Sequence, residues 1–172
     1  MEPLFFIAQA CGICGLILLF VSFQTKTTQK ICLAQSIACV FFVAQFSLLG
    51  AWTGAALNGL SLVRNLVYAN NDKKWASGIY WPIGFSVINA IFVIFTWADI
   101  FSLLPAIAMV VSNFALQLKN AQLARAVNFP ASPLWLVYDL HTKAYMGVFN
   151  EIMVMSSILL GLWRYRKEKK AE

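Results

Sequence analysis

The chain has 172 residues, of which 60% are hydrophobic and 12% are charged, and its formal net charge is +6. A soluble domain of this length would carry more charge to cover its surface, so the composition predicts an integral membrane protein. The basic residues stand in short loops and in one tail, which favours a role in membrane orientation over nucleic-acid binding.

Seven apolar segments follow one another along the chain. A membrane-spanning helix needs about 20 largely apolar residues, and the first segment reaches that length without the basic start of a signal peptide, so a cleaved signal is not expected. Pro82 falls in the first turn of the fourth segment, where its missing N–H costs little. The predicted helices cover residues 3–23, 31–49, 51–70, 78–97, 99–118, 123–141 and 144–165.

The sixth segment, 123–141, is the least apolar of the seven. It contains Asn128, Pro130, Pro133 and Asp139, which make a solvated loop the alternative interpretation. Its aromatic and aliphatic residues are too many for such a loop. We therefore predict a sixth helix that is broken or kinked by its prolines and sheltered by neighbouring helices.

A repeat with an offset of 93 positions relates the two halves of the chain. Gly54 and Asn58 in the third predicted helix correspond to Gly147 and Glu151 in the seventh, and the run QTKTTQ that starts at Gln24 corresponds to QLKNAQ 93 positions later. A fixed period indicates a duplicated unit. We predict an all-α fold of two parallel three-helix units, residues 1–70 and 98–165, joined by a loop and a linker helix (71–97) and followed by a basic tail (166–172).

The distribution of basic residues predicts how this 3+1+3 fold crosses the membrane. Twelve of the thirteen Lys and Arg residues fall at or near one side of the seven-helix model, and only Lys143 falls on the other. The positive-inside rule then places the N-terminus outside and the C-terminal tail in the cytoplasm. Aromatic residues are expected to mark the outer interface (Trp52, Trp97, Tyr145) and the inner one (Trp75, Trp163, Tyr165).

Several of these motifs resemble those of a known family. Gln24 and Lys26, the run LGAWTG that ends at Gly54, the run SPLW that ends at Trp135, and Glu151 resemble the YgjV-type bacterial inner membrane family. The 3+1+3 plan is also similar to the PQ-loop and SWEET sugar-transporter superfamily. This resemblance implies a bacterial inner membrane location and a central pocket that Asn58 and the pair Asn150–Glu151 face.

The chain departs from that superfamily at the proline of the PQ motif. Phe23 and Leu116 stand where the motif has proline, so the proline hinge of that helix is absent from both units. The candidate hinge or gate residues that remain are Gln24, Gln117, Pro130 and Pro133.

Ionisable residues inside the predicted helices are the strongest candidates for a functional site. Glu151 lies about 10 Å from the outer end of its helix, where a carboxylate marks a functional site by default. A structural pairing with Arg64 or an amide is the alternative. Asn58 is expected at the same depth, either in the pocket or in an interhelical hydrogen bond. Arg64 is predicted to extend to the cytoplasmic interface, with the pocket as the alternative.

Aromatic residues and the single histidine complete the set of candidates. Trp135 and Tyr138 are predicted either to form a stacking wall for a planar or sugar-like ligand or to pack in the core. His141, beside Asp139 and Lys143, is interpreted as an interfacial residue, with pH sensing as the alternative.

The polar residues predict binding and transport rather than catalysis. The sequence shows no nucleophile–base pair, phosphate loop or metal-ligand cluster, so we expect no enzyme, no cofactor and no metal site. The four cysteines lie in apolar segments and are interpreted as packing residues. The predicted function is translocation of a small polar solute between the two units, and the alternative is a non-transporting membrane adaptor or ligand receptor. The expected partners are the lipid bilayer and the solute, without nucleic acid, and a homodimer is a candidate assembly.

Overall fold

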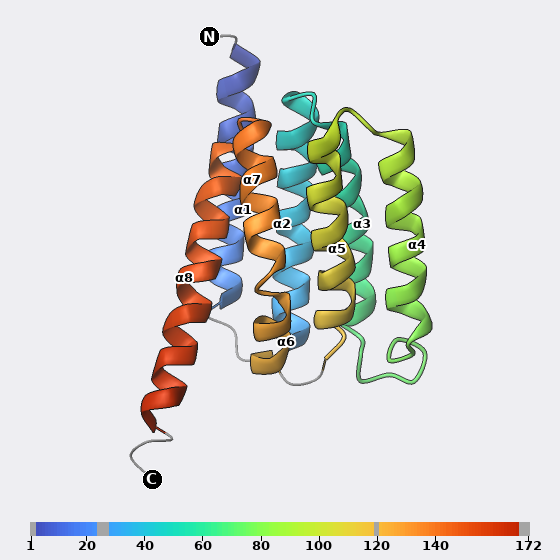
Figure 1. Ribbon diagram of the computed structural model, residues 1–172, viewed down its shortest axis with the longest axis vertical. Coiled ribbons are helices and arrows are strands. Elements are labelled where there is room, and N and C mark those ends of the chain that lie inside the picture. The colour runs from blue at the N-terminus through green and yellow to red at the C-terminus, as the bar shows by residue number, and fades with distance from the viewer. Residues whose placement is uncertain (1–2, 24–27, 119–120, 169–172) are drawn as a thin grey trace.

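The computed structural model describes residues 3–23, 28–118 and 121–168 of the chain (Figure 1). Within these ranges it contains eight α-helices, one turn of 3-10 helix and no strand. The elements are α1 (Pro3–Phe23), α2 (Thr28–Leu48), α3 (Trp52–Tyr68), α4 (Tyr80–Phe95), η1 (Ile100–Ser102), α5 (Leu103–Ala115), α6 (Ala121–Asn128), α7 (Ala131–His141) and α8 (Tyr145–Glu168).

The long helices stand side by side and run in alternating directions, so α1 begins at the end of the bundle opposite to the one where α8 finishes (Figure 1). Helices α1, α2 and α3 pack together, as do α5, α7 and α8. The two groups meet where α1 contacts α8 and where α3 contacts α5. Helix α4 lies at the edge of the bundle against α3 and α5.

All seven segments predicted to be helical contain helix, but two differ in detail. Residues 99–118 begin with the 3-10 turn η1. The Asp99 carboxylate caps the start of this turn by accepting a hydrogen bond from the Phe101 N–H at 2.9 Å. Residues 123–141 form α6 and α7 with a break at Phe129 and Pro130. Pro130 has no N–H to donate to Ala126, and the Phe129 N–H bonds to that carbonyl instead at 3.3 Å. The break predicted from the prolines is therefore present.

Two tight turns share one backbone structure at the predicted offset of 93 residues. Gly50 between α2 and α3 has φ of 70°, and Lys143 between α7 and α8 has φ of 60°. The Ala51 N–H donates to the Phe46 carbonyl at 2.9 Å, and the Ala144 N–H donates to the Asp139 carbonyl at 2.8 Å. Both are the Schellman arrangement, in which a left-handed residue ends one helix and the next N–H caps it. The sequence offset thus relates the two turns bond for bond.

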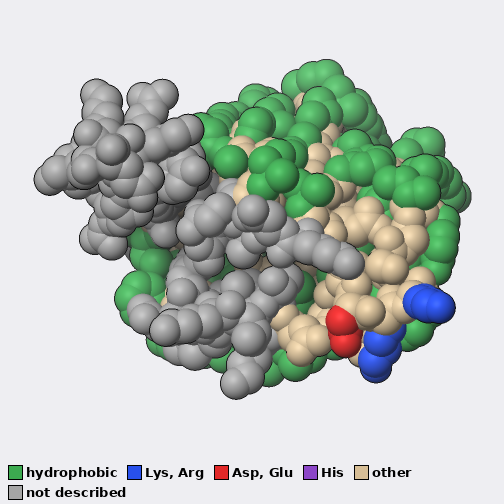
Figure 2. Space-filling view, turned by 90° about the horizontal axis from the view of Figure 1, so that it is seen from below, with side chains coloured by type: hydrophobic (Ala, Val, Ile, Leu, Met, Phe, Trp, Pro, Cys, Tyr) green, Lys and Arg blue, Asp and Glu red, His purple; other side chains and the backbone are tan. Residues whose placement is uncertain are grey.

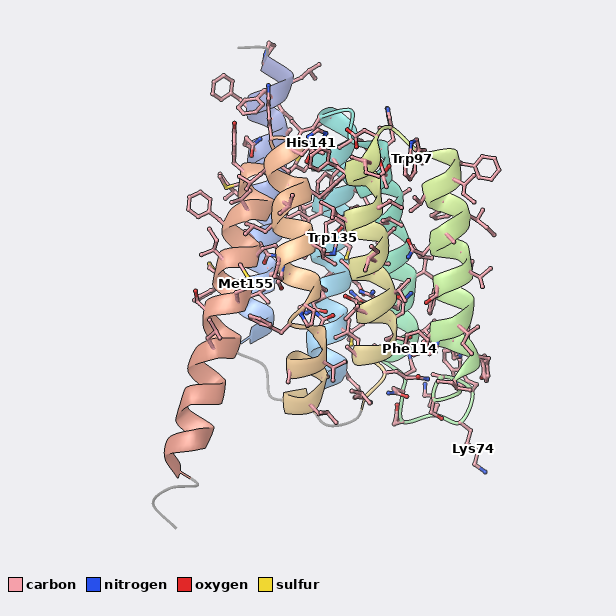
Figure 3. The ribbon with its side chains drawn as sticks, viewed as in Figure 1. Lys74, Trp97, Phe114, Trp135, His141 and Met155 are labelled. Carbon is pink, nitrogen blue, oxygen red and sulfur yellow. The ribbon has the colours of Figure 1, made fainter. Side chains whose placement is uncertain are left out.

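The outer surface of the bundle is largely apolar. Among the described residues, one window is both long and apolar enough to cross a membrane, Pro3–Phe20, and shorter apolar helices cover Cys32–Leu48, Tyr80–Phe95 and Ile100–Ala115. In the end-on view of Figure 2, charged side chains gather over the segment between α3 and α4, where Asp72, Lys73 and Lys74 are exposed. Trp97 lies at the other end of the bundle (Figure 3).

Candidate functional site

A cavity of about 150 Å³ lies in the middle of the bundle, between α1, α2 and α3 on one side and α5, α7 and α8 on the other. Trp135, on α7, points into the interior about midway between the two ends (Figure 3). The cavity is lined by apolar residues and by nine polar or charged ones. The polar and charged lining residues are Gln35, Asn58, Ser61, Arg64, Asn65, Ser112, Asp139, Asn150 and Glu151.

Helical spacing explains why these side chains converge. Residues three or four positions apart share one face of a helix. On α3 this spacing places Asn58, Ser61 and Asn65 on the cavity face, while Val63 on the opposite face is exposed. On α8, Gly147 and Glu151 stand four apart on the same face, as the repeated element predicts.

Two carboxylates lie at one end of the cavity. Asp139 is only 2% exposed, and its Oδ1 atom has no hydrogen-bond partner among the described residues. A Cβ atom placed on Gly147 would lie 2.7 Å from Cγ of Asp139, so only glycine leaves room for this carboxylate. Glu151 accepts a hydrogen bond from the Asn150 amide at 3.0 Å and has a second partner in Ser132. This end of the cavity is therefore rich in acceptor oxygen atoms.

The Arg64 guanidinium is the cationic end of the site. Its side chain is 5% exposed and is held by neutral partners. It donates to the Asn65 side-chain oxygen at 3.2 Å and to that of Asn113 at 3.2 Å. Asn113 in turn donates to Ser86 on α4 at 3.2 Å, and its carbonyl accepts from the Tyr68 hydroxyl at 2.7 Å. This network fixes the guanidinium without neutralising it.

The charged groups of the cavity are not paired with one another. Among the described residues, the ion pair formed is that of His141 with Asp99, at 2.6 Å between Nε2 and Oδ2. That pair is half-exposed at the end of α7, where the imidazole stacks on Phe101 with ring centroids 4.1 Å apart. Arg64 stands six residues beyond Asn58 on α3, about 9 Å further along the axis by helical rise.

The structure brings together four of the five residues predicted to bind solute. Asn58, Trp135, Asn150 and Glu151 all line the cavity. The Asn58 amide donates to the Gly54 carbonyl of its own helix at 2.9 Å, and Trp135 packs against Phe46 with centroids 6.2 Å apart.

Tyr138, the fifth predicted residue, does not line the cavity. Its hydroxyl accepts the Gly54 N–H at 2.9 Å and its side chain is 3% exposed, so it ties α7 to α3. Of the two interpretations of Tyr138, these contacts correspond to packing in the core, because the close approach to Gly54 directs the ring into the contact between helices.

The three candidate hinge residues that the structure describes lie apart from the cavity. The Gln117 amide donates to the Gly78 carbonyl at 2.6 Å, which ties the end of α5 to the segment before α4. Pro130 precedes α7 and Pro133 lies in its first turn, both exposed. Gln24 lies outside the described residues.

Of the three ionisable residues that line the cavity, the sequence predicts only Glu151 as its first interpretation, whereas Arg64 enters as an alternative and Asp139 is not named as a site residue. Arg64 takes the alternative position, buried in the cavity lining, and does not extend to the cytoplasmic interface, because Asn65 and Asn113 supply hydrogen-bond acceptors there. Asp139 was treated only as a lowering of hydropathy, and as a neighbour of His141, whose partner is in fact Asp99. The available signal was that each is an ionisable residue inside a predicted span.

Comparison with known proteins identifies the family. The family model Imp-YgjV, described as bacterial inner membrane protein, matches residues 6–169. The chain belongs to this family. Comparisons with the curated proteins and with the solved structures give no match. The YgjV-type resemblance of the sequence is thereby confirmed, and the buried charges of the cavity belong to a protein of the bacterial inner membrane.

Proposed function

We propose that this YgjV-family protein translocates a small polar solute across the inner membrane through the cavity between α1–α3 and α5–α8. The observation that supports the proposal is the set of ionisable side chains from both halves that face one cavity without pairing. Charged residues inside a membrane protein are costly and mark solute or ion pathways by default. Neutral hydrogen bonds hold Arg64 and Glu151 in place, but none of the three ionisable side chains Arg64, Asp139 and Glu151 has a counter-charge among the described residues.

The size of the cavity limits the solute. A cavity of about 150 Å³ in another protein accommodates a benzene-sized ligand, so the volume found here suits a solute of roughly six to eight non-hydrogen atoms. A disaccharide or a nucleotide is too large for this state of the cavity.

The arrangement of the helices supports alternating exposure of the cavity to the two sides. We take the protein to be a seven-span 3+1+3 fold whose two units share the turn structure described above. Parallel repeats related by an axis along the membrane normal are a known transporter plan, with the solute bound near the midplane at the repeat interface. The contacts of α1 with α8 and of α3 with α5 are the two equivalent contacts that such an axis relates.

Release of solutes from proteoliposomes tests the proposal. Liposomes are loaded with a defined mixture of neutral, anionic, cationic and zwitterionic solutes of six to eight non-hydrogen atoms, and mass spectrometry follows their loss. Ser61 faces the cavity at 3.1 Å from the Met109 sulfur, whereas Val63 on the same helix is exposed to the outside. We expect at least one solute to leave faster than from protein-free liposomes, and Ser61→Phe to stop this while Val63→Phe does not.

The contrary outcomes are equally clear. If no solute leaves faster with the wild-type protein, transport is rejected. If a solute raises the unfolding temperature but is not released, the protein is a ligand receptor of the same fold. Thermal unfolding of Ser61→Phe separates a blocked cavity from an unfolded protein.

A further inference from the structure

The two charged ends of the cavity restrict the chemistry of the solute more than its volume does. Arg64, Asp139 and Glu151 all line the cavity. Glu151 is the 93-residue counterpart of Asn58, and Arg64 lies six residues beyond Asn58 on α3, so we place the guanidinium and the carboxylates at different depths of the cavity. A buried charge without a counter-charge is strongly unfavourable, yet no salt bridge joins Arg64 to either carboxylate in the described part of the chain. The missing counter-charges are those that a bound solute can bring.

Unsatisfied acceptors mark the place for a cationic group. Asp139 is 2% exposed, and neither its Oδ1 atom nor the Oδ1 atom of Asn150 has a hydrogen-bond partner within the described part of the chain. An ammonium group has three N–H donors and no acceptor. It would donate hydrogen bonds to both oxygen atoms, and its positive charge would be the counter-charge for Asp139 and Glu151.

The guanidinium end suits a carboxylate. Arg64 makes four hydrogen bonds, to the side-chain oxygens of Asn65 and Asn113 and to the Met109 sulfur, so its charge and one of its five N–H donors are left for a solute. A guanidinium pairs with a carboxylate through directional, charge-assisted hydrogen bonds. Asn65 and Asn113 hold the side chain in position for such a partner.

We propose that the solute is a small zwitterion, an amino carboxylate whose carboxylate binds at Arg64 and whose ammonium group binds at Asp139 and Glu151. This inference rests on the proposed solute cavity. Since Arg64 lies about 9 Å along α3 from the level of Asn58, the two charged groups of the solute stand at opposite ends of its carbon chain. 4-Aminobutanoate, with seven non-hydrogen atoms, has this form and suits the volume of about 150 Å³.

Equilibrium binding to the purified full-length protein in lipid nanodiscs tests the inference without any transport. The probes are 4-aminobutanoate, its isomer 2-aminobutanoate, and the singly charged butanoate and butylamine. We expect 4-aminobutanoate to bind about tenfold or more tighter than each of the other three, because losing one charge-assisted contact removes at least that factor. Equal binding of butanoate or of butylamine overturns the inference, as does equal binding of 2-aminobutanoate.

Charge-removing variants assign the two ends. Arg64→Gln keeps a donor for Asn113 but loses the charge, so it should weaken 4-aminobutanoate about tenfold while leaving butylamine unchanged. Asp139→Asn and Glu151→Gln should do the reverse, weakening the amino acid and butylamine but not butanoate. Asp72→Asn and Lys74→Gln, in the exposed segment between α3 and α4, are the matched controls and should change nothing.

The possible results separate this inference from the proposed function. Selective binding without release from proteoliposomes upholds the zwitterion site and rejects transport. Release of neutral or singly charged solutes without preference for the zwitterion upholds transport and rejects the zwitterion site. If the variants of Arg64 or Asp139 do not fold, Glu151→Gln is used instead. The inference then requires that this folded variant binds 4-aminobutanoate no more tightly than it binds butanoate.

Discussion

At the scale of single residues, the site depends on glycines that admit a neighbouring side chain. Gly54 is closely approached by Phe46, and Gly147, its counterpart 93 positions later, is closely approached by Asp139, the counterpart of Phe46. The same contact between equivalent positions thus carries an aromatic ring in one half and a carboxylate in the other. This substitution makes one end of the cavity acidic.

The first prediction concerns Gly147. A methyl group there would press on the Asp139 carboxylate, so Gly147→Ala should lower the free energy of unfolding by about 1–3 kcal/mol, the usual cost of overpacking. Gly59→Ala is the control, since no atom lies within 4 Å of its added Cβ. That change should be neutral or stabilise the helix by up to about 1 kcal/mol. Thermal unfolding in detergent measures both.

A double variant identifies the cause of this loss. Asp139→Ala removes Cγ and both carboxylate oxygen atoms, which are the atoms that collide, so Gly147→Ala should cost little when it is made in that background. If Gly147→Ala costs as much there as in the wild-type chain, or no more than Gly59→Ala in the wild type, the proposed contact does not limit position 147.

The sequence alone located three of the nine polar and charged residues that line the cavity. Asn58 and Glu151 could be predicted because the repeat places them at equivalent positions, and Asn150 could be predicted because polar residues are rare in apolar helices. Arg64 could not be placed, because a long basic side chain near a helix end can either reach the interface or turn inward. The acceptors that turn it inward include Asn113, which is distant in sequence. Whether a charged side chain has a counter-charge can be seen only once the helices are packed together.

At the scale of elements, the chain uses the same helix–turn–helix joint twice. The prolines predicted the break between α6 and α7, and the repeat predicted that residues 123–141 are helical despite their low hydropathy. The start of α5 differs from the prediction, because the Asp99 side chain caps a 3-10 turn that precedes the α-helix. The identical turns also expose one conflict between sequence and backbone, at Lys143.

The second prediction follows from this conflict. A left-handed residue other than glycine costs about 1–2 kcal/mol, whereas glycine costs about 0.4–1 kcal/mol more in entropy of the unfolded chain. Lys143→Gly should therefore be neutral or stabilise the protein by up to about 1 kcal/mol. Gly50→Ala, at the equivalent position, should destabilise it by a similar amount or more.

Lys143→Ala separates the backbone from the side chain. It keeps the unfavourable φ of 60° and removes the charge, so it should not reproduce any gain from Lys143→Gly. Equal effects of alanine and glycine at position 143 would mean that the lysine side chain, and not the left-handed backbone, sets the stability of this turn.

At the scale of the whole molecule, the charge distribution and the direction of the helices point to one orientation. The exposed Lys73 and Lys74 lie at the end of the bundle where α8 finishes, and Lys143 lies in the turn beside His141 at the opposite end (Figure 3). Cytoplasmic loops of inner membrane proteins carry the excess of Lys and Arg. We therefore expect the segment between α3 and α4 and the C-terminus to face the cytoplasm, and the N-terminus and Lys143 to face the periplasm.

Reporter fusions after Lys74, after Lys143 and at the C-terminus test this orientation. Alkaline phosphatase is active only in the periplasm, so the fusion at Lys143 should be active and the other two inactive, with the opposite pattern for a green fluorescent reporter. The pair formed by Lys143 and the C-terminus is decisive for α8, because a single crossing must separate them. The pair formed by Lys74 and Lys143 is decisive for the broken segment. Between these two points α4, α5 and α6–α7 must make three crossings, and if α6 and α7 did not cross together, only two would remain and both fusions would report the same side. That result would remove the sixth span, and the two halves could then no longer be parallel units around one cavity.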